Sequence, residues 1–124
     1  MKMVRFSVPP YKVNVALIQV EGAADEERAK ECCEEMGLGD KDTSAVLNAI
    51  KSGGHDYGDT FHDFMHRQIL VVFYRMTSSR TNAYGHEKRH VEDRILQWCG
   101  IDDMESAAYL AGFLSEYFDD LRFK

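Results

Sequence analysis

The sequence KVNVALIQV, residues 12–20, decides the fold. It is rich in β-branched residues, and apolar side chains occupy both of its alternating faces. A strand of this kind suits a sheet that helices cover. A second segment, QILVVFYRM at residues 68–76, has a continuous apolar centre bounded by polar residues and also predicts a strand. We therefore expect a buried sheet built around these two segments.

Two helices are expected between these strands. The first begins near Asp25, where an acidic first turn leads into apolar residues at helical spacing, and it ends at Gly37. The second begins near Thr43 or Ser44 and ends at Gly53 and Gly54. The residues that follow it, 55–66, are expected to be irregular or partly extended.

The C-terminal third of the chain is helical by pattern. One helix presents Val91, Ile95 and Trp98 on a single face, and a last helix follows with Asp102 or Asp103 as its cap. With a further short strand near the N-terminus, the order indicates an α+β fold. We expect a short β-sheet with N-terminal helices and a C-terminal helix pair.

Composition limits the class of protein. The chain has 124 residues, 44% of them hydrophobic, and we expect one domain over residues 1–124. The formal net charge of −6 and the absence of a basic run argue against nucleic acid as a partner. No apolar segment is long enough for a signal peptide or a membrane span, and the adjacent Cys32 and Cys33 fit a disulfide framework poorly. We expect a cytoplasmic protein with free thiols and no membrane partner.

The residues that carry chemistry form an H-E-x-x-H motif from His86 to His90. On a helix, these two histidines lie one turn apart on one face, so both imidazoles can bind one metal ion. Glu87 lies about 100° round the axis, where its carboxylate can take a proton from a water molecule that the metal acidifies. The motif predicts a zinc site in which Glu87 is the catalytic base. The alternative is a surface helix whose histidines pair with acids such as Asp93.

A catalytic zinc ion usually has three protein ligands, so a third ligand is needed. Asp93 converges poorly with the histidines, because three ligands along one straight helix span about 10 Å. Glu105 lies in the first turn of the next helix, after a turn that contains glycine. Tyr84 and Tyr109 are candidate hydrogen-bond donors to an oxyanion. The remaining candidate ligands are Glu116 and the histidines before the second strand, His55, His62 and His66.

The motif and the segment ESAAYLAGFL at residues 105–114 resemble small HExxH proteins of phages and mobile elements, of the gluzincin-like (zincin) metallopeptidase type. In these proteins a strand leads into the HExxH helix, and a second helix opens with a glutamate that an apolar run follows. The resemblance covers residues 55–118 and is best over 86–114. It implies a zincin-like fold with His86, His90 and Glu105 as ligands of Zn²⁺ and Glu87 as the base.

The first function hypothesis is a zinc-dependent hydrolase, a minimal zincin-type metallopeptidase that acts on a protein or peptide. The alternatives are a non-catalytic metal-binding protein and a protein-interaction module without a metal. A metal site with an open coordination position favours the enzyme. A site closed by Asp93, Glu116 or a loop histidine favours a structural role.

Overall fold

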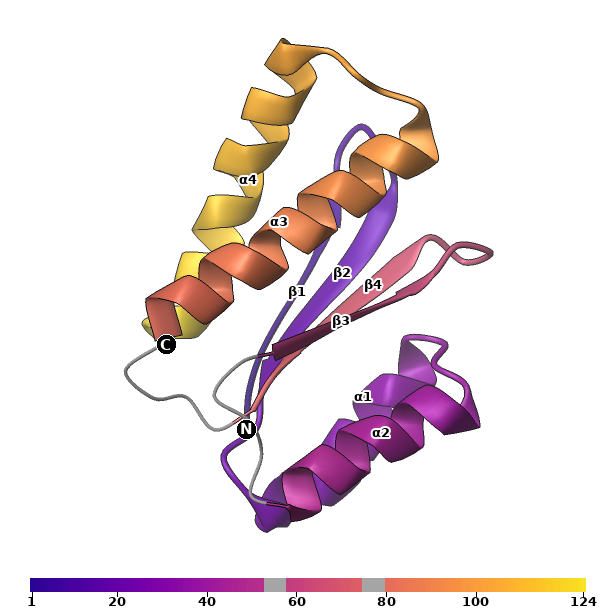
Figure 1. Ribbon diagram of the computed structural model, residues 1–124, viewed down its shortest axis with the longest axis vertical. Coiled ribbons are helices and arrows are strands. Elements are labelled where there is room, and N and C mark those ends of the chain that lie inside the picture. The colour runs from indigo at the N-terminus through magenta and orange to yellow at the C-terminus, as the bar shows by residue number, and fades with distance from the viewer. Residues whose placement is uncertain (53–57, 75–79) are drawn as a thin grey trace.

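A four-stranded sheet forms the middle of the molecule. The computed structural model describes residues 1–52, 58–74 and 80–124. Strands β1 and β2 pair antiparallel, as do β3 and β4, while the central β2 and β4 run parallel (Figure 1). The strand order is β1-β2-β4-β3. The strands are β1 (Lys2–Val8), β2 (Val13–Gln19), β3 (Gly58–Asp63) and β4 (Gln68–Phe73).

Helices cover both faces of this sheet. A short 3₁₀ turn, η1 (Ala23–Asp25), leads into α1 (Glu26–Glu35), and α2 (Asp40–Lys51) follows. These helices lie on one face, whereas α3 (Arg80–Cys99) and α4 (Met104–Arg122) lie on the other (Figure 1). The α+β prediction is thus confirmed at the level of a mixed sheet with an N-terminal and a C-terminal helix pair. Within the described part of the chain, no helix combines the length and apolar character needed to cross a membrane.

The alternation of side chains in β2 explains the three layers. Val15 and Leu17 belong to the core on the side of α3 and α4, while Ala16 and Ile18 belong to the core on the side of α1 and α2. All four side chains are essentially inaccessible to solvent. Since successive residues of a strand point to opposite faces, a strand that is apolar at every position needs helices on both sides. The β4 strand repeats this pattern.

Several predicted boundaries are confirmed by backbone geometry. Gly37 ends α1 with φ at +81°, a left-handed conformation that glycine adopts without steric cost. Asp103 caps α4, because its carboxylate accepts a hydrogen bond from the Ser106 backbone N–H at 2.8 Å. The start of α2 was predicted too late. The helix begins at Asp40, so that Asp40 and Asp42 lie in its first turn, where the helix dipole favours negative charge.

The β3 strand was not predicted. Its sequence, GDTFHD, is polar at most positions, and the segment was expected to be irregular or partly extended. Only Phe61 packs against the core on the side of α1 and α2. Because β3 is at the edge of the sheet and pairs with one neighbour, it needs fewer apolar residues than a central strand. The predicted end of the second helix at Gly53, and His55, lie outside the described residues.

The two adjacent cysteines are expected to be chemically silent in the folded protein. Cys32 and Cys33 are buried between α1 and the sheet, and burial raises the pKa of the Cys33 thiol to about 12. At pH 8 such a thiol is ionised in only about one molecule in 10,000, and the thiolate is the reactive form. We expect an aromatic disulfide reagent at pH 8 to label the half-buried Cys99 first, and to label all three cysteines only in urea. Rapid labelling of Cys33 in the native protein would contradict this.

Candidate functional site

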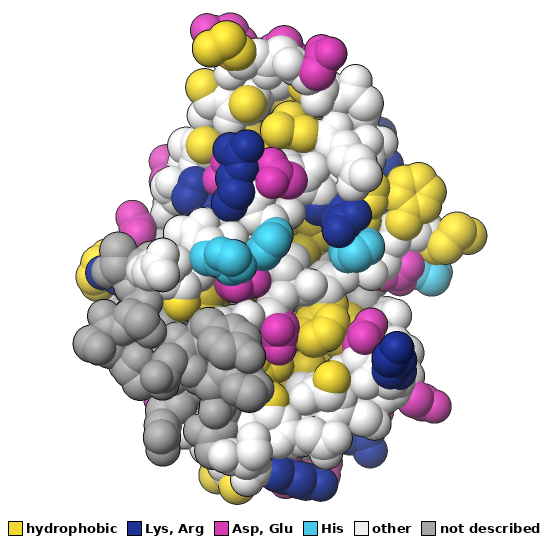
Figure 2. All heavy atoms as spheres, in the orientation of Figure 1, with side chains coloured by type: hydrophobic (Ala, Val, Ile, Leu, Met, Phe, Trp, Pro, Cys, Tyr) yellow, Lys and Arg dark blue, Asp and Glu magenta, His cyan; other side chains and the backbone are white. Residues whose placement is uncertain are grey.

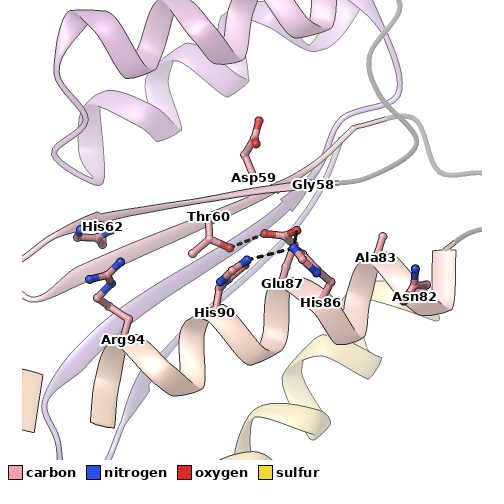
Figure 3. Close-up of a pocket in the computed structure, with 10 residues that line it drawn as sticks. All are labelled: Gly58, Asp59, Thr60, His62, Asn82, Ala83, His86, Glu87, His90 and Arg94. Atoms are coloured by element: carbon pink, nitrogen blue, oxygen red, sulfur yellow. Dashed lines mark hydrogen bonds and ion pairs between the residues drawn. The ribbon is translucent and has the colours of Figure 1, made fainter. Parts of the chain in front are cut away.

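The HExxH residues line a pocket between α3 and the edge strand β3. The pocket has a volume of about 620 Å³. Figure 3 shows its walls, with Thr60 on β3 facing the side chains that α3 projects. Figure 2 shows histidine side chains close together on the surface of the molecule, where α3 borders β3. The side chains that matter for chemistry are Thr60, His62, His86, Glu87, His90 and Arg94.

His86 and His90 lie side by side, as their spacing on one helix predicts. Their Nε2 atoms are 3.1 Å apart, and their rings are nearly perpendicular, at 86°. The His86 side chain is 64% exposed. The two Nε2 atoms therefore face each other at hydrogen-bonding distance, and solvent or a ligand can reach them.

Glu87 is buried directly behind the histidines. Its residue is only 3% exposed. Its Oε1 accepts a hydrogen bond from Thr60 Oγ1 at 2.8 Å, and its Oε2 lies 3.8 Å from His86 Nε2 (Figure 3). Burial raises the pKa of this carboxyl group, although the Thr60 hydrogen bond and the two histidines oppose the shift. A carboxyl group whose pKa is moved toward neutrality is suited to proton transfer.

The backbone at Gly58 allows this close approach of β3 to α3. A Cβ atom at Gly58 would lie 2.7 Å from the Val72 carbonyl oxygen and 3.1 Å from Glu87 Cγ. No residue with a side chain fits there without displacing the strand or the glutamate. Gly58, Thr60 and His62 share the face of β3 that looks toward α3, because they pair with Phe73, Val71 and Ile69, which face α3 and α4.

Sequence reasoning missed Gly58 and Thr60 as parts of the site. The available signal was alternation: positions 58, 60 and 62 lie on one face of a strand, opposite to Phe61. That signal has meaning only once residues 58–63 are assigned to a strand.

The two histidines fit a divalent metal as a pair of ligands. Zinc binds imidazole nitrogens at 2.0–2.1 Å in tetrahedral geometry, so two such ligands lie about 3.3–3.4 Å apart. The observed 3.1 Å between the Nε2 atoms is close to this value. Within residues 1–52, 58–74 and 80–124, no group of three or more His, Cys, Asp or Glu side chains is arranged to hold a metal ion.

The structure does not bring Glu105 to the histidines. Helix α3 continues for nine residues beyond His90 to Cys99, which corresponds to about 13 Å of helix. Glu105 lies beyond that end, in the first turn of α4, and its side chain is exposed. It does not line the pocket. Of the three metal ligands that the resemblance implies, only His86 and His90 therefore lie together.

The other candidate ligands are engaged or placed elsewhere. Asp93 forms an ion pair with Arg89 at 3.1 Å. His66 pairs with Asp63 at 2.6 Å. Glu116 is an exposed residue of α4 and does not line the pocket. Of the histidines from the segment before β4, His62 lines the pocket, and His55 lies outside the described residues.

The two tyrosines considered as oxyanion donors do not serve this site. The Tyr84 hydroxyl is buried and donates a hydrogen bond to Gln19 Oε1 at 2.8 Å. The Tyr109 hydroxyl donates to the Pro9 carbonyl oxygen at 2.9 Å. Neither residue lines the pocket. Because both hydroxyl groups bind elsewhere and neither residue lines the pocket, the oxyanion prediction is wrong for these two residues.

No family model matches the chain, and neither a curated protein nor a solved structure shows significant similarity to it.

Proposed function

We propose that the protein is a zinc-dependent hydrolase, a minimal zincin-type metallopeptidase that acts on a protein or peptide. His86 and His90 bind the metal, and Glu87 is the general base. The observation that carries the proposal is the position of Glu87: a buried carboxylate, held by Thr60, behind two converging imidazoles at the wall of a pocket. Burying a carboxylate costs free energy, and a raised pKa in a cleft is typical of residues that transfer protons.

The two carboxylate oxygens of Glu87 have different contacts, and the proposal gives them different roles. Oε1 accepts the Thr60 hydrogen bond, which fixes the orientation of the carboxylate. Oε2 lies on the side of His86, and in this proposal it takes a proton from water and delivers it to the leaving amine. A bound zinc ion would polarise the scissile carbonyl and lower the pKa of water.

The openness of the pocket supports a hydrolase over a closed structural metal site. Asp93 and His66 are held in ion pairs away from the two imidazoles, and Glu116 does not line the pocket. Within the described residues, no third His, Cys, Asp or Glu side chain is grouped with the two imidazoles to hold a metal ion. A zinc ion held by the two imidazoles would keep positions for water and substrate, although it would lack the third protein ligand that catalytic zinc sites usually have.

The position of β3 supports a peptide as the substrate. This strand is at the edge of the sheet, so one row of its backbone N–H and C=O groups has no neighbouring strand among the described residues. An extended peptide can add to such an edge through backbone hydrogen bonds. The same strand contributes Gly58 and Thr60 to the pocket, which places that edge beside the proposed reacting groups.

Zinc binding tests the metal-site part of the proposal. We expect the wild-type protein to bind about one zinc ion per chain, measured by elemental analysis and by calorimetric titration. The His86→Ala/His90→Ala variant should lose at least about 100-fold in zinc affinity, because loss of even an outer-shell partner of a metal ligand costs 10–100-fold. Glu105→Ala should stay within about threefold of the wild type, since Glu105 lies beyond the far end of α3.

His66→Ala is the matched control, because it removes an exposed histidine that pairs with Asp63 outside the pocket. It should leave zinc affinity unchanged. A wild-type protein that takes up no zinc, or a double variant that binds as tightly as the wild type, would refute the metal site. A large loss in Glu105→Ala would instead show that metal binding draws α4 toward the histidines and completes the set implied by the resemblance.

A further inference from the structure

Arg94 is a cation of the pocket that has no acidic partner among the described residues. It follows His86 and His90 on one ridge of α3, at intervals of four residues, and its guanidinium enters the pocket opposite His62 (Figure 3). Its side chain is half-buried, and its Nη1 donates a hydrogen bond to Gln97 Oε1 at 2.9 Å. Within residues 1–52, 58–74 and 80–124, no carboxylate lies at ion-pairing distance from it.

The other basic residues near the motif, unlike Arg94, form ion pairs with acidic side chains. Lys88 pairs with Glu92 at 2.6 Å, and Arg89 pairs with both Glu92 and Asp93. These pairs lie on α3 itself, so the helix supplies acids to the cations that face away from the pocket. In a chain with a net charge of −6, a half-buried arginine without such a partner in the described structure leaves donors available for a ligand.

His62 faces Arg94 across the pocket from β3. Its ring contacts Trp98 edge to face, with centroids 5.9 Å apart, which holds it at the rim. Burial lowers the pKa of His62, and the positive charge of Arg94 lowers it further, while the negative charge of Asp42 opposes the shift. The two side chains thus present hydrogen-bond donors to the same space, and Arg94 supplies the positive charge. An anion placed there gains charge-assisted hydrogen bonds, and a carboxylate can bind the planar guanidinium through two of them.

We infer that Arg94, with His62, binds a carboxylate of the peptide substrate beside the scissile bond. The position of the carboxylate beside a scissile bond rests on the proposed function, whereas the binding of a carboxylate by Arg94 does not. Arg94 is four positions after His90, which corresponds to a rise of about 6 Å along the helix. An extended peptide advances about 3.3 Å per residue. The recognised carboxylate therefore lies about two residues from the carbonyl that reacts at the histidines. An acidic side chain and a free C-terminal carboxylate share this chemistry.

Binding of short peptides to the metal-free protein tests the inference. The probes are three alanine-based tetrapeptides: one neutral with both ends blocked, one blocked with an internal aspartate, and one with a free C-terminal carboxylate. Binding is measured by titration with heteronuclear NMR. We expect at least one carboxylate peptide to bind about tenfold more tightly than the neutral one. The peptide that shows the preference identifies the source of the carboxylate.

Variants of two arginines on the same helix show whether Arg94 is responsible. Arg94→Ala should remove the preference, and Arg94→Lys should keep only part of it, since lysine cannot make the two-pronged contact. Arg89→Ala is the matched control, because it removes a 69% exposed arginine outside the pocket, and it should keep the preference. The NMR spectrum of each variant reports whether it is folded.

Equal affinity for all three peptides, or a preference that survives in Arg94→Ala, would overturn the inference. Because neither zinc nor hydrolysis is needed, a protein that prefers carboxylates but binds no zinc would refute the proposed hydrolase and leave this binding site standing. A protein that binds zinc without any carboxylate preference would refute this binding site and leave the proposed hydrolase standing.

Discussion

Replacement of Glu87 by glutamine is expected to lower the rate of peptide hydrolysis by roughly 10²–10⁴-fold, the usual contribution of a positioned acid or base. The glutamine side chain would keep the size of the original and an oxygen that accepts the Thr60 hydrogen bond, but it cannot take a proton. The loss should appear in kcat, with KM and zinc affinity nearly unchanged. Turnover of a pool of fluorogenic peptides by the zinc-loaded protein is the measurement.

The direction of the pKa shift predicts that the Glu87→Gln variant stays folded, so a loss of activity would come from the missing base. Burial raises the pKa of Glu87, so the fold disfavours the ionised form. Stability therefore falls as pH rises from the ordinary carboxyl pKa to the higher pKa of the folded protein, and it stays lower above that point. Glu87→Gln removes this charge, and at pH 7 it should be as stable as the wild type or more stable by about 1 kcal/mol.

Glu116→Gln is the control for the activity measurement, because Glu116 is exposed on α4 and does not line the pocket. It should retain full activity. Zinc-dependent hydrolysis that persists in Glu87→Gln would contradict the role of Glu87 as base. A Glu87→Gln protein that also loses zinc would point to a ligand role for this carboxylate.

Replacement of Phe73 by alanine is expected to lower the free energy of unfolding by about 3–5 kcal/mol, the range for a fully buried phenylalanine. Phe73 has no exposed surface. Its ring stacks on Tyr84 with centroids 4.2 Å apart and meets Phe118 edge to face at 6.2 Å, so it joins β4 to α3 and α4. Urea denaturation followed by circular dichroism gives the change.

The same substitution is expected to weaken zinc binding, although Phe73 does not touch the pocket histidines. Tyr84 lies two residues before His86, and the Phe73 ring supports that turn of α3. Phe123→Ala is the control: this residue is 73% exposed at the end of the chain and should change stability by no more than about 0.5 kcal/mol. A loss below about 1 kcal/mol in Phe73→Ala would mean that this aromatic contact does not anchor α3.

The sequence by itself determined the parts of this protein that depend on short-range periodicity. The apolar run in β2 predicted a strand covered on both faces, and the helical spacing around Val91 and Ile95 predicted α3. The meeting of His86 and His90 needed only the geometry of one helix turn, and Asp103 needed only its place before α4. Each of these depends on residues a few positions apart, whose relative placement regular backbone geometry already sets.

Only the tertiary structure decided the surroundings of those histidines. Thr60 reaches Glu87 across 27 residues of sequence, and His62 faces Arg94 because β3 adds to the edge of the sheet beside α3. The same is true of Glu105, whose distance from the site follows from where α3 ends and α4 begins. Strand order and helix placement result from packing the apolar faces of all elements together. A local pattern in a polar edge strand or in a turn between helices does not determine that packing.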